Sequence, residues 1–286
     1  MPEQKLGKFD ASLEIVKESW AVLRQDKEMV LFPIIGAVVN VLFILGVLYF
    51  FFIRGDLLSL IRNPNGNGSN LVGYGVTLVF YLVSFFISYF FQSGVLIIAH
   101  ARFNGENLSF SDGFNGALNN IGKILALSSI SATVGLILNI ISEKSKMIGK
   151  IIAALFGAAW NILTYFSLPS LIIGKTTVRD SFKDSASVIR KTWGESIIIS
   201  MGVGFFFFVI TIAGLIVAVG AAYLIGQVFA ALIIAGLFIV YLIILSIISS
   251  TLGIVYKLAL YEYAKTGVVP QGFSANLIKD AIIISK

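Results

Sequence analysis

Cysteine is absent from this 286-residue sequence, and histidine occurs only once, at His100. The lack of cysteine excludes disulfide bonds, thiol catalysis and cysteine-ligated metals. A single histidine has no second imidazole with which to share a metal ion, and no phosphate-binding loop of the form G-x-x-x-x-G-K-S/T occurs. We therefore expect neither a metal nor a cofactor, and we expect a structural role for His100.

Charged residues are also scarce, because they make up 13% of the chain against roughly 25% in soluble proteins. Hydrophobic residues make up 57%, and the mean hydropathy is +0.93. A soluble fold cannot bury several apolar runs that each exceed about 18 residues, whereas a bilayer requires runs of that length. The runs are continuous and do not alternate as strands of a membrane barrel do. We therefore predict an all-α bundle of transmembrane helices.

Six apolar runs are long enough to cross a membrane. The predicted spans are residues 29–53, 71–98, 124–141, 151–173, 196–225 and 228–256. The predicted organisation is a cytoplasmic amphipathic segment at 1–28, a six-span transmembrane domain at 29–264 and a cytoplasmic tail at 265–286. Residues 1–28 are charged and lack an apolar stretch directly after a basic start, so we expect no cleaved signal peptide.

Lysine and arginine concentrate on one side of this arrangement. The N-terminal segment, the loops after the second and fourth spans, and the tail hold most of them, and the net charge is +6. Basic loops stay in the cytoplasm, so we predict a multi-pass protein of the cell membrane with both termini cytoplasmic. No dense basic run occurs, which makes membrane lipid and not nucleic acid the expected partner. A second copy of the chain, or another membrane protein, stays open as a further partner.

A helical spacing of apolar residues, at i, i+4, i+7 and i+11, occurs before the first, third and fifth spans. The three sets are Phe9, Leu13, Val16 and Trp20; Phe114, Leu118, Ile121 and Leu125; and Phe182, Ala186, Ile189 and Trp193. This spacing lines one face of a helix, and the residues between are mostly polar. Such helices suit the membrane interface, and the predicted anchors are Phe9, Trp20, Phe114, Phe182 and Trp193.

We interpret this pattern as a threefold internal repeat of an interfacial helix followed by a transmembrane hairpin. Asp112-x-Phe114 and Asp180-x-Phe182 align at one offset, near expected helix starts where a carboxylate satisfies free backbone N–H groups. All three units start on the same side, as parallel transporter repeats do. The simpler alternative is that any helix beside a membrane is amphipathic, without a repeat.

Uncharged polar residues are the remaining candidates for a functional site, because no predicted span has a charge near its centre. Ser84, Ser88 and Gln92 are four residues apart, so they share one face of the second span. The other candidates within or beside the spans are Asn40, Asn139, Asn161 and Tyr165. Two interpretations stay open: hydrogen bonds between helices, or a polar cavity near the bilayer centre. The missing charge argues against a proton-coupled pump and against an enzyme.

Proline is rare, with five in the chain, and two of them bear on helix geometry. Pro169 lies in the fourth predicted span, where the loss of a backbone hydrogen bond predicts a kink. Gly267 followed by Pro270 predicts the end of the last helix.

Five segments carry a resemblance to known proteins: SWAVLRQDKE at 19–28, SATVGLIL at 131–138, GAAW at 157–160, RKTWGE at 190–195 and ALYEYAKTGVVP at 259–270. They resemble a family of uncharacterised prokaryotic integral membrane proteins with six helices. A more distant similarity is to the membrane domain attached to some glycerophosphodiester phosphodiesterases, whose soluble catalytic part this chain lacks. The resemblance implies a multi-span protein of a prokaryotic cell membrane and transfers no catalytic residue.

Two functional hypotheses follow. The leading one is passive or facilitated passage of a small solute or ion along the polar face of the second span. The alternative is a non-transporting membrane organiser or assembly partner, which binds lipid or protein through its interfacial helices.

Overall fold

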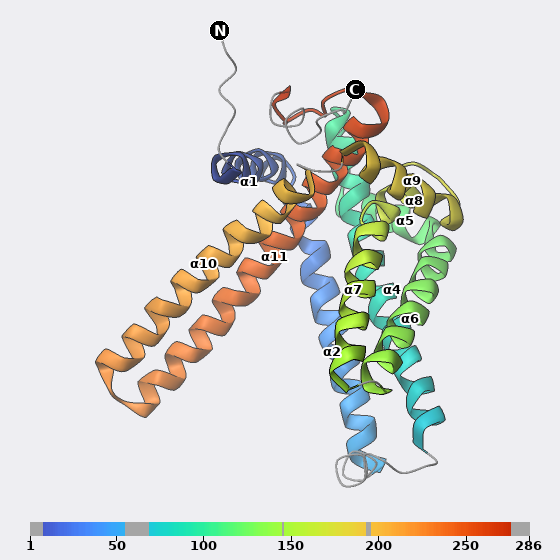
Figure 1. Ribbon diagram of the computed structural model, residues 1–286. Helices are drawn as coiled ribbons and strands as arrows, with labels where there is room; N and C mark the ends of the chain where they lie inside the picture. The colour runs from blue at the N-terminus through green and yellow to red at the C-terminus, as the bar shows by residue number, and fades with distance from the viewer. Residues whose placement is uncertain (1–7, 55–68, 145, 193–195, 276–286) are drawn as a thin grey trace. The chain divides into compact units, whose positions relative to one another are not determined.

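The computed structural model describes residues 8–54, 69–144, 146–192 and 196–275 (Figure 1). Its helices are α1 (Lys8–Gln25), η1 (Lys27–Val30), α2 (Leu31–Arg54), α4 (Ser69–Phe103), α5 (Phe110–Asn119), α6 (Ile121–Lys144), α7 (Lys146–Thr164), α8 (Ser167–Ile172), α9 (Val178–Thr192), α10 (Ser196–Ile225) and α11 (Val228–Thr266). No strand occurs within these described ranges, and the all-α prediction is confirmed.

Six helical stretches are long and apolar enough to cross a membrane. They are Lys27–Ile53, Gly73–Phe103, Ile121–Glu143, Met147–Ile172, Phe206–Ile225 and Val228–Thr266. Each overlaps one of the predicted spans, because an uninterrupted apolar run of this length has few folded alternatives. The chain is therefore a multi-pass membrane protein.

The last span continues beyond its predicted end at Tyr256. α11 has 39 residues, which is about 58 Å of helix, whereas the hydrocarbon core is about 30 Å thick. The helix ends at Gly267, whose φ of 71° is left-handed and whose N–H donates to the carbonyl of Tyr263 at 2.8 Å. This confirms the predicted helix stop, because glycine adopts that conformation without a steric cost.

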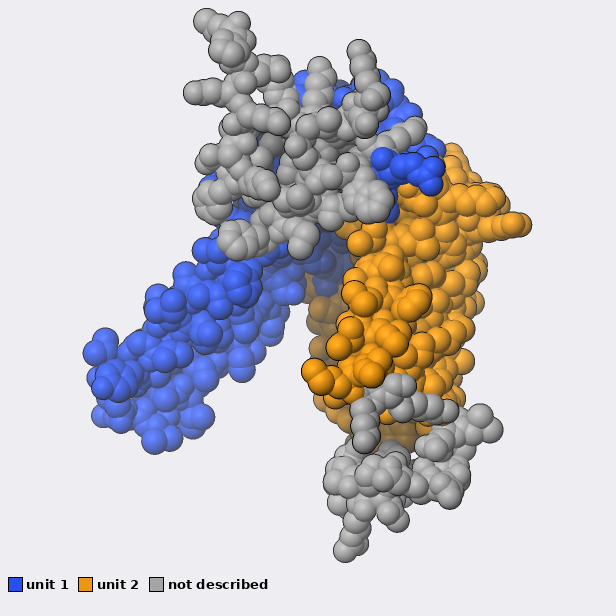
Figure 2. All heavy atoms as spheres, viewed as in Figure 1, with its two compact units in different colours: residues 1–33, 98–109, 187–286 blue, residues 34–97, 110–186 orange. Residues whose placement is uncertain are grey.

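The chain forms two compact units, which are coloured separately in Figure 2. The first unit comprises residues 1–33, 98–109 and 187–286, and the second comprises residues 34–97 and 110–186.

In the first unit, α10 and α11 run side by side as a hairpin (Figure 1). The Tyr241 hydroxyl of α11 donates a hydrogen bond to the carbonyl oxygen of Ile210 in α10 at 2.8 Å. Gly214 lies beneath the same ring, and a Cβ atom there would be 2.6 Å from Tyr241 Cε1. A small residue at this position therefore allows the two helices to approach closely.

The N-terminal helix and the segment after α11 contact each other within the first unit. The Ser274 N–H donates to both carboxylate oxygens of Glu18 at 3.2 Å. The segment after α11 also contacts the end of α4, where the rings of Phe103 and Phe273 pack edge to face with their centroids 5.8 Å apart. Glu18 and Ser274 thus lie at the same end of this unit.

The second unit contains most of α2 and α4, the α6–α7 hairpin and the shorter helices α5 and α8. Phe90 of α4 packs edge to face on Phe114 of α5, with centroids 5.2 Å apart. Gly135 of α6 lies against Tyr81 of α4, and a Cβ there would be 3.2 Å from the ring. Aromatic rings therefore fill the space between α4 and its neighbours.

The kink predicted at Pro169 is a complete break in the fourth span. α7 ends at Thr164, and α8 begins at Ser167. Pro169 therefore lies in the first turn of α8, where its missing N–H costs no helical hydrogen bond. Tyr165 and Phe166 form the turn between the two helices.

Candidate functional site at the membrane interface

The described helices follow the predicted order of an amphipathic helix and then a hairpin. α1 precedes α2 and α4, α5 precedes α6 and α7, and α9 precedes α10 and α11. One predicted anchor, Trp193, and the side chain of another, Phe9, lie outside the described part of the structure.

α1 has two apolar faces rather than one. It packs on α10 and α11, and its buried residues include Ile15 and Val22. The predicted anchor face is a different one, on which Leu13 and Val16 are half-buried and Trp20 is 37% exposed. The predicted face is therefore only partly exposed, at Trp20, while the other face holds the helix on the protein.

The second predicted apolar set is divided between two helices. α5 ends at Asn119 and α6 begins at Ile121, so Phe114 and Leu118 belong to α5 and Leu125 belongs to α6. The predicted continuous interfacial helix at this position is therefore wrong in its length. A bend at this point separates the interfacial helix from the span.

α9 begins with a reciprocal cap. The Asp180 N–H donates to Thr177 Oγ1 at 3.2 Å, and the Thr177 hydroxyl donates to Asp180 Oδ2 at 2.7 Å. Hydrogen bonds from Thr177 and Lys183 lower the pKa of Asp180 below its usual value. A carboxylate near this helix start was predicted to satisfy free backbone N–H groups. The described hydrogen bonds give that role to Thr177 Oγ1, which accepts from the Asp180 N–H, whereas the Asp180 carboxylate accepts from the Thr177 hydroxyl and from Lys183.

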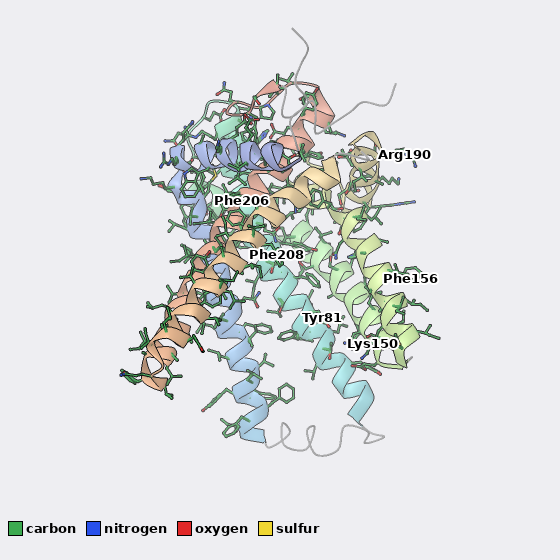
Figure 3. The ribbon with its side chains drawn as sticks, turned by 60° about the vertical axis from the view of Figure 1, so that its left-hand side comes forward. Tyr81, Lys150, Phe156, Arg190, Phe206 and Phe208 are labelled. Atoms are coloured by element: carbon green, nitrogen blue, oxygen red, sulfur yellow. The ribbon has the colours of Figure 1, made fainter. Side chains whose placement is uncertain are left out.

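The two faces of α9 differ sharply in character. Ser181, Ser185, Val188 and Ile189 are buried on one face. Arg179, Lys183 and Arg190 are exposed, and their spacing of i, i+4 and i+11 aligns them on the opposite face. Figure 3 labels Arg190 on this helix. The exposed face of α9 is therefore a basic stripe, defined by these three residues.

Specific contacts fix α9 in place. The Phe166 N–H donates to Ser185 Oγ at 3.0 Å, and the Ser170 hydroxyl donates to Asp184 Oδ2 at 2.7 Å. The predicted anchor Phe182 packs on Trp160 of α7, with ring centroids 5.6 Å apart. α8, which supplies Ser170, is entirely buried. These contacts with α7, α8 and the turn between them therefore fix the position of α9 on the protein.

The polar face of α4 is satisfied by its own helix at Ser88, whereas the buried Ser84 hydroxyl has no hydrogen-bond partner among the described residues. The Ser88 hydroxyl donates to the Ser84 carbonyl at 2.8 Å, and Gln92 is half-buried. A hydrogen bond from α4 to another helix joins the Tyr89 hydroxyl and Ser131 Oγ of α6, which are 3.0 Å apart. The sequence did not indicate Tyr89, because a tyrosine within a phenylalanine-rich run has the same pattern as a residue that packs through its ring alone.

The remaining polar candidates are distributed over three other helical segments. Asn40 of α2 and Asn139 of α6 are half-buried, whereas Asn161 of α7 is exposed. Tyr165 packs edge to face on Phe166, with centroids 4.7 Å apart, in the turn after α7. An exposed Asn161 does not face a closed polar cavity.

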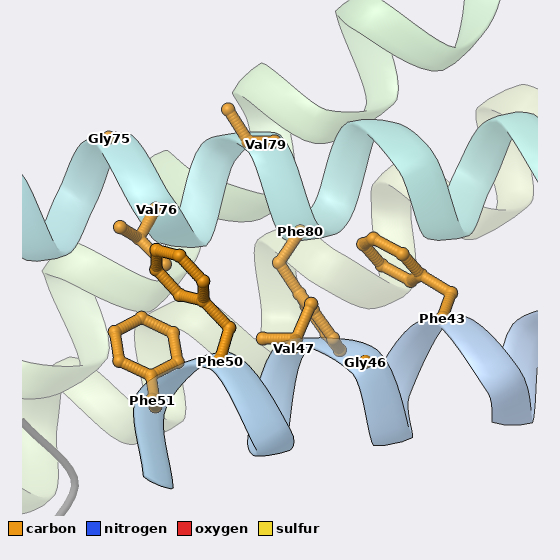
Figure 4. A pocket seen from close by; sticks show the side chains of 9 residues that line it. All are labelled: Phe43, Gly46, Val47, Phe50, Phe51, Gly75, Val76, Val79 and Phe80. Atoms are coloured by element: carbon orange, nitrogen blue, oxygen red, sulfur yellow. The ribbon is translucent and has the colours of Figure 1, made fainter. Parts of the chain in front are cut away.

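A hollow of about 620 Å³ lies between α2 and α4 (Figure 4). Its lining is Phe43, Gly46, Val47, Phe50, Phe51, Gly75, Val76, Val79 and Phe80. None of the predicted polar candidates contributes to it, and every lining residue is apolar.

Two contacts between titratable side chains lie in the first unit, and no sequence pattern indicated them. His100 Nδ1 is 2.6 Å from Glu262 Oε1, and Arg102 Nη2 is 3.4 Å from Asp26 Oδ2. Burial raises the pKa of Asp26, although the hydrogen bond from Arg102 opposes that shift. These pairs join the end of α4 to α11 and to the turn before η1, so they organise the helix ends.

Comparisons with known proteins assign the chain to a family but indicate no activity. No curated protein matches the chain, and no solved structure matches it. Nothing in these comparisons supports the resemblance to glycerophosphodiester phosphodiesterases. One family model, described as a family of unknown function (DUF6159), matches residues 71–272, which is more than half of the chain. The protein therefore belongs to the DUF6159 family.

Proposed function

We propose that this protein is a non-transporting membrane organiser that recruits anionic lipid headgroups through its interfacial helices. The observation that carries the proposal is the basic stripe of α9, which comprises Arg179, Lys183 and Arg190 on a helix fixed by side-chain contacts. A helix that is already positioned loses little conformational freedom when it binds a headgroup.

The charges on α9 determine how strongly the protein should prefer anionic over zwitterionic lipid. A basic side chain near an anionic membrane surface contributes about 1 kcal/mol. Lys183 Nζ lies 3.4 Å from Asp180 Oδ1, so its charge is partly offset. Arg179 and Arg190 together then contribute about 2 kcal/mol, which is roughly a thirtyfold preference for anionic over zwitterionic lipid.

Tryptophan quenching by brominated lipids tests this preference. Replacing Trp20 and Trp193 by phenylalanine leaves Trp160, which packs on Phe182 of α9. In reconstituted vesicles, we expect acyl-brominated phosphatidylglycerol to quench Trp160 more strongly than acyl-brominated phosphatidylcholine. The difference shrinks in about 1 M salt, where the Debye length is about 3 Å.

The matched variants are R179Q/R190Q and K150Q. Lys150 is an exposed basic residue near the start of α7, whereas α9 contacts the other part of α7 at Trp160 (Figure 3). The preference disappears in R179Q/R190Q and persists in K150Q if the proposal is correct. Equal quenching by the two lipids in the parent protein at low salt refutes it.

A second candidate is passage of a small solute or ion, and one observation favours it. The Ser84 hydroxyl is buried and has no hydrogen-bond partner among the described residues. Buried polar groups of this kind are commonly satisfied by water. Water at Ser84 would place a solvated site within the second span.

Cysteine accessibility separates this candidate from the first. The chain lacks cysteine, so S84C, S88C and Q92C provide single labels on a clean background. Labelling of these positions by a membrane-impermeant thiol reagent, with F85C unlabelled, supports passage. Protection of all three from both sides of the membrane leaves the lipid-recruiting function as the working model.

A further inference from the structure

We infer that the hollow between α2 and α4 is an acyl-chain groove, which holds one hydrocarbon tail of a membrane lipid. The inference concerns a different part of the molecule from the basic stripe of α9 and does not rest on the proposed function. It follows from the shape of the hollow, from its lining and from its place within two membrane spans.

The groove is a wedge that is closed at one end. The rings of Phe43 and Phe80 stack with centroids 5.7 Å apart and join α2 to α4. Further along in the same direction, Gly36 lies against Phe91, and a Cβ at Gly36 would be 3.0 Å from that ring. The opposite end is lined by Phe50, Phe51, Val76 and Gly75 (Figure 4). Because the stacked rings close the other end, we expect a chain to enter from the Phe50 end and to stop at those rings.

Two glycines keep the groove open. Gly46 of α2 and Gly75 of α4 both line it, and a Cβ at either position would meet no atom within 4 Å. Glycine is less favourable in a helix than alanine by roughly 0.8–1.0 kcal/mol. Larger side chains at these positions would fill the groove and would not strain the backbone.

The lining selects among the occupants available in a membrane. Water needs two to four polar partners, and the lining offers none from its side chains. A third helix, about 10–12 Å across, would have to continue past the closed end at Phe43 and Phe80 to cross the bilayer. A hydrocarbon tail is thin enough to end there, and the volume of about 620 Å³ lies within the usual range of ligand sites.

The physical basis of this binding is fit rather than hydrophobicity. Lipid tails are as apolar as the lining, so moving a tail from the bilayer into the groove gains no hydrophobic free energy. Van der Waals contact with the seven aromatic and aliphatic side chains of the lining favours the tail that fills the wedge. We therefore expect selection by chain shape and length, with little dependence on the headgroup.

Photolabelling of the full-length protein tests the inference. The protein is reconstituted in vesicles of phosphatidylethanolamine and phosphatidylglycerol that contain a phosphatidylcholine with a diazirine near the end of one acyl chain. We expect the label on peptides containing Phe43 and Phe80. A second probe, with the diazirine close to the headgroup, labels the Phe50 and Val76 region instead.

G46L/G75L is the groove-filling variant, and G220L/G236L is its control on the α10–α11 hairpin. A Cβ at Gly220 or Gly236 also meets no atom within 4 Å. Filling the groove lowers labelling at Phe43 and Phe80 to the level found on α10 and α11, and the control leaves it unchanged. V79F fills the groove from α4 without altering either glycine and gives the same loss.

Three results would overturn the inference. The first is uniform labelling of α2, α4, α10 and α11 in the parent protein. The second is labelling at Phe43 that persists in both G46L/G75L and V79F. The third is an efficient disulfide between two copies of V47C, which would make the face a protein interface. None of these readouts depends on anionic headgroups, so the proposed function and this inference fail separately.

Discussion

Gly214 sets the distance between two helices through a single absent side chain. The Tyr241 ring occupies the position where a Cβ would lie, and its hydroxyl is held by the carbonyl of Ile210. The contact is local, but it fixes the approach of α10 to α11 because a ring cannot be compressed.

Gly214→Ala is expected to destabilise the protein, because its Cβ would overlap Tyr241 Cε1 at 2.6 Å. Overpacking of this kind costs about 1–3 kcal/mol. Thermal unfolding in detergent measures the effect as a lower Tm. Gly220→Ala on the same helix has open space and serves as the control. Equal Tm values for the two variants would contradict the close approach.

Asp26 predicts a specific dependence of stability on pH. Burial raises the pKa of its carboxyl group above 3.8, so the folded state binds more protons than the unfolded state just above that pH. The contribution of Asp26 to stability therefore falls as pH rises from about 3.8 through the raised pKa. Glu18, whose pKa burial also raises, acts in the same direction.

Asp26→Asn removes the titration and retains an oxygen that accepts a hydrogen bond from Arg102. We expect its Tm to change less with pH in this window than the Tm of the parent protein. Adding Glu18→Gln flattens the profile further. A steeper decline in Asp26→Asn than in the parent protein would show that the carboxyl does not bind its proton more tightly in the folded state.

The interfacial helix α9 depends on a few hydrogen bonds that arise from other elements. Ser185→Ala would leave the buried N–H of Phe166 without its acceptor. An unsatisfied buried donor costs about 1–3 kcal/mol, so Tm falls and amide exchange at Phe166 accelerates. Ser187→Ala, at an exposed position of the same helix, is the control. Unchanged exchange at Phe166 in Ser185→Ala would show that this bond does not hold α9.

The elements that sequence predicts well are those with a local physical cause. An apolar run predicts a span, and Gly267 predicts a helix end, because neither depends on distant residues. The break at Pro169 and the two faces of α1 depend on what packs against those segments. The partly exposed predicted face of α1 shows the difference, since periodicity identifies an apolar face without identifying what covers it.

The same distinction applies to the candidate site. The spacing of Ser84, Ser88 and Gln92 correctly places them on one face, but the Ser88 hydroxyl bonds to its own helix. A serine in a helix has a backbone acceptor four residues earlier, and the sequence does not say whether that bond or a cavity is used. The groove at Gly46 and Gly75 is equally hidden, because it requires knowing that the two helices face each other there.

For the whole molecule, the placement of its ends restricts how it crosses the membrane. The Ser274 N–H donates to Glu18, so we expect the N-terminal helix and the segment after α11 to lie on the same side of the bilayer. The basic segments favour the cytoplasmic side for both. We then expect the turn between α10 and α11 at Gln227 to face the opposite side, because α11 separates it from Gly267.

Single cysteines at Gln25, Gln271 and Gln227 test this topology, since all three residues are exposed and the chain has no cysteine of its own. We expect an impermeant thiol reagent to label Q227C in intact cells, and to label Q25C and Q271C only in inverted vesicles. Labelling of all three cysteines in the same preparation would contradict this topology. Gln227 would then lie on the same side of the membrane as Gln25 and Gln271. Labelling of Q25C and Q271C in intact cells would reverse the orientation and place the basic stripe of α9 outside the cytoplasm. Labelling of Q25C and Q271C from opposite sides would contradict both the contact between Glu18 and Ser274 and an even number of spans.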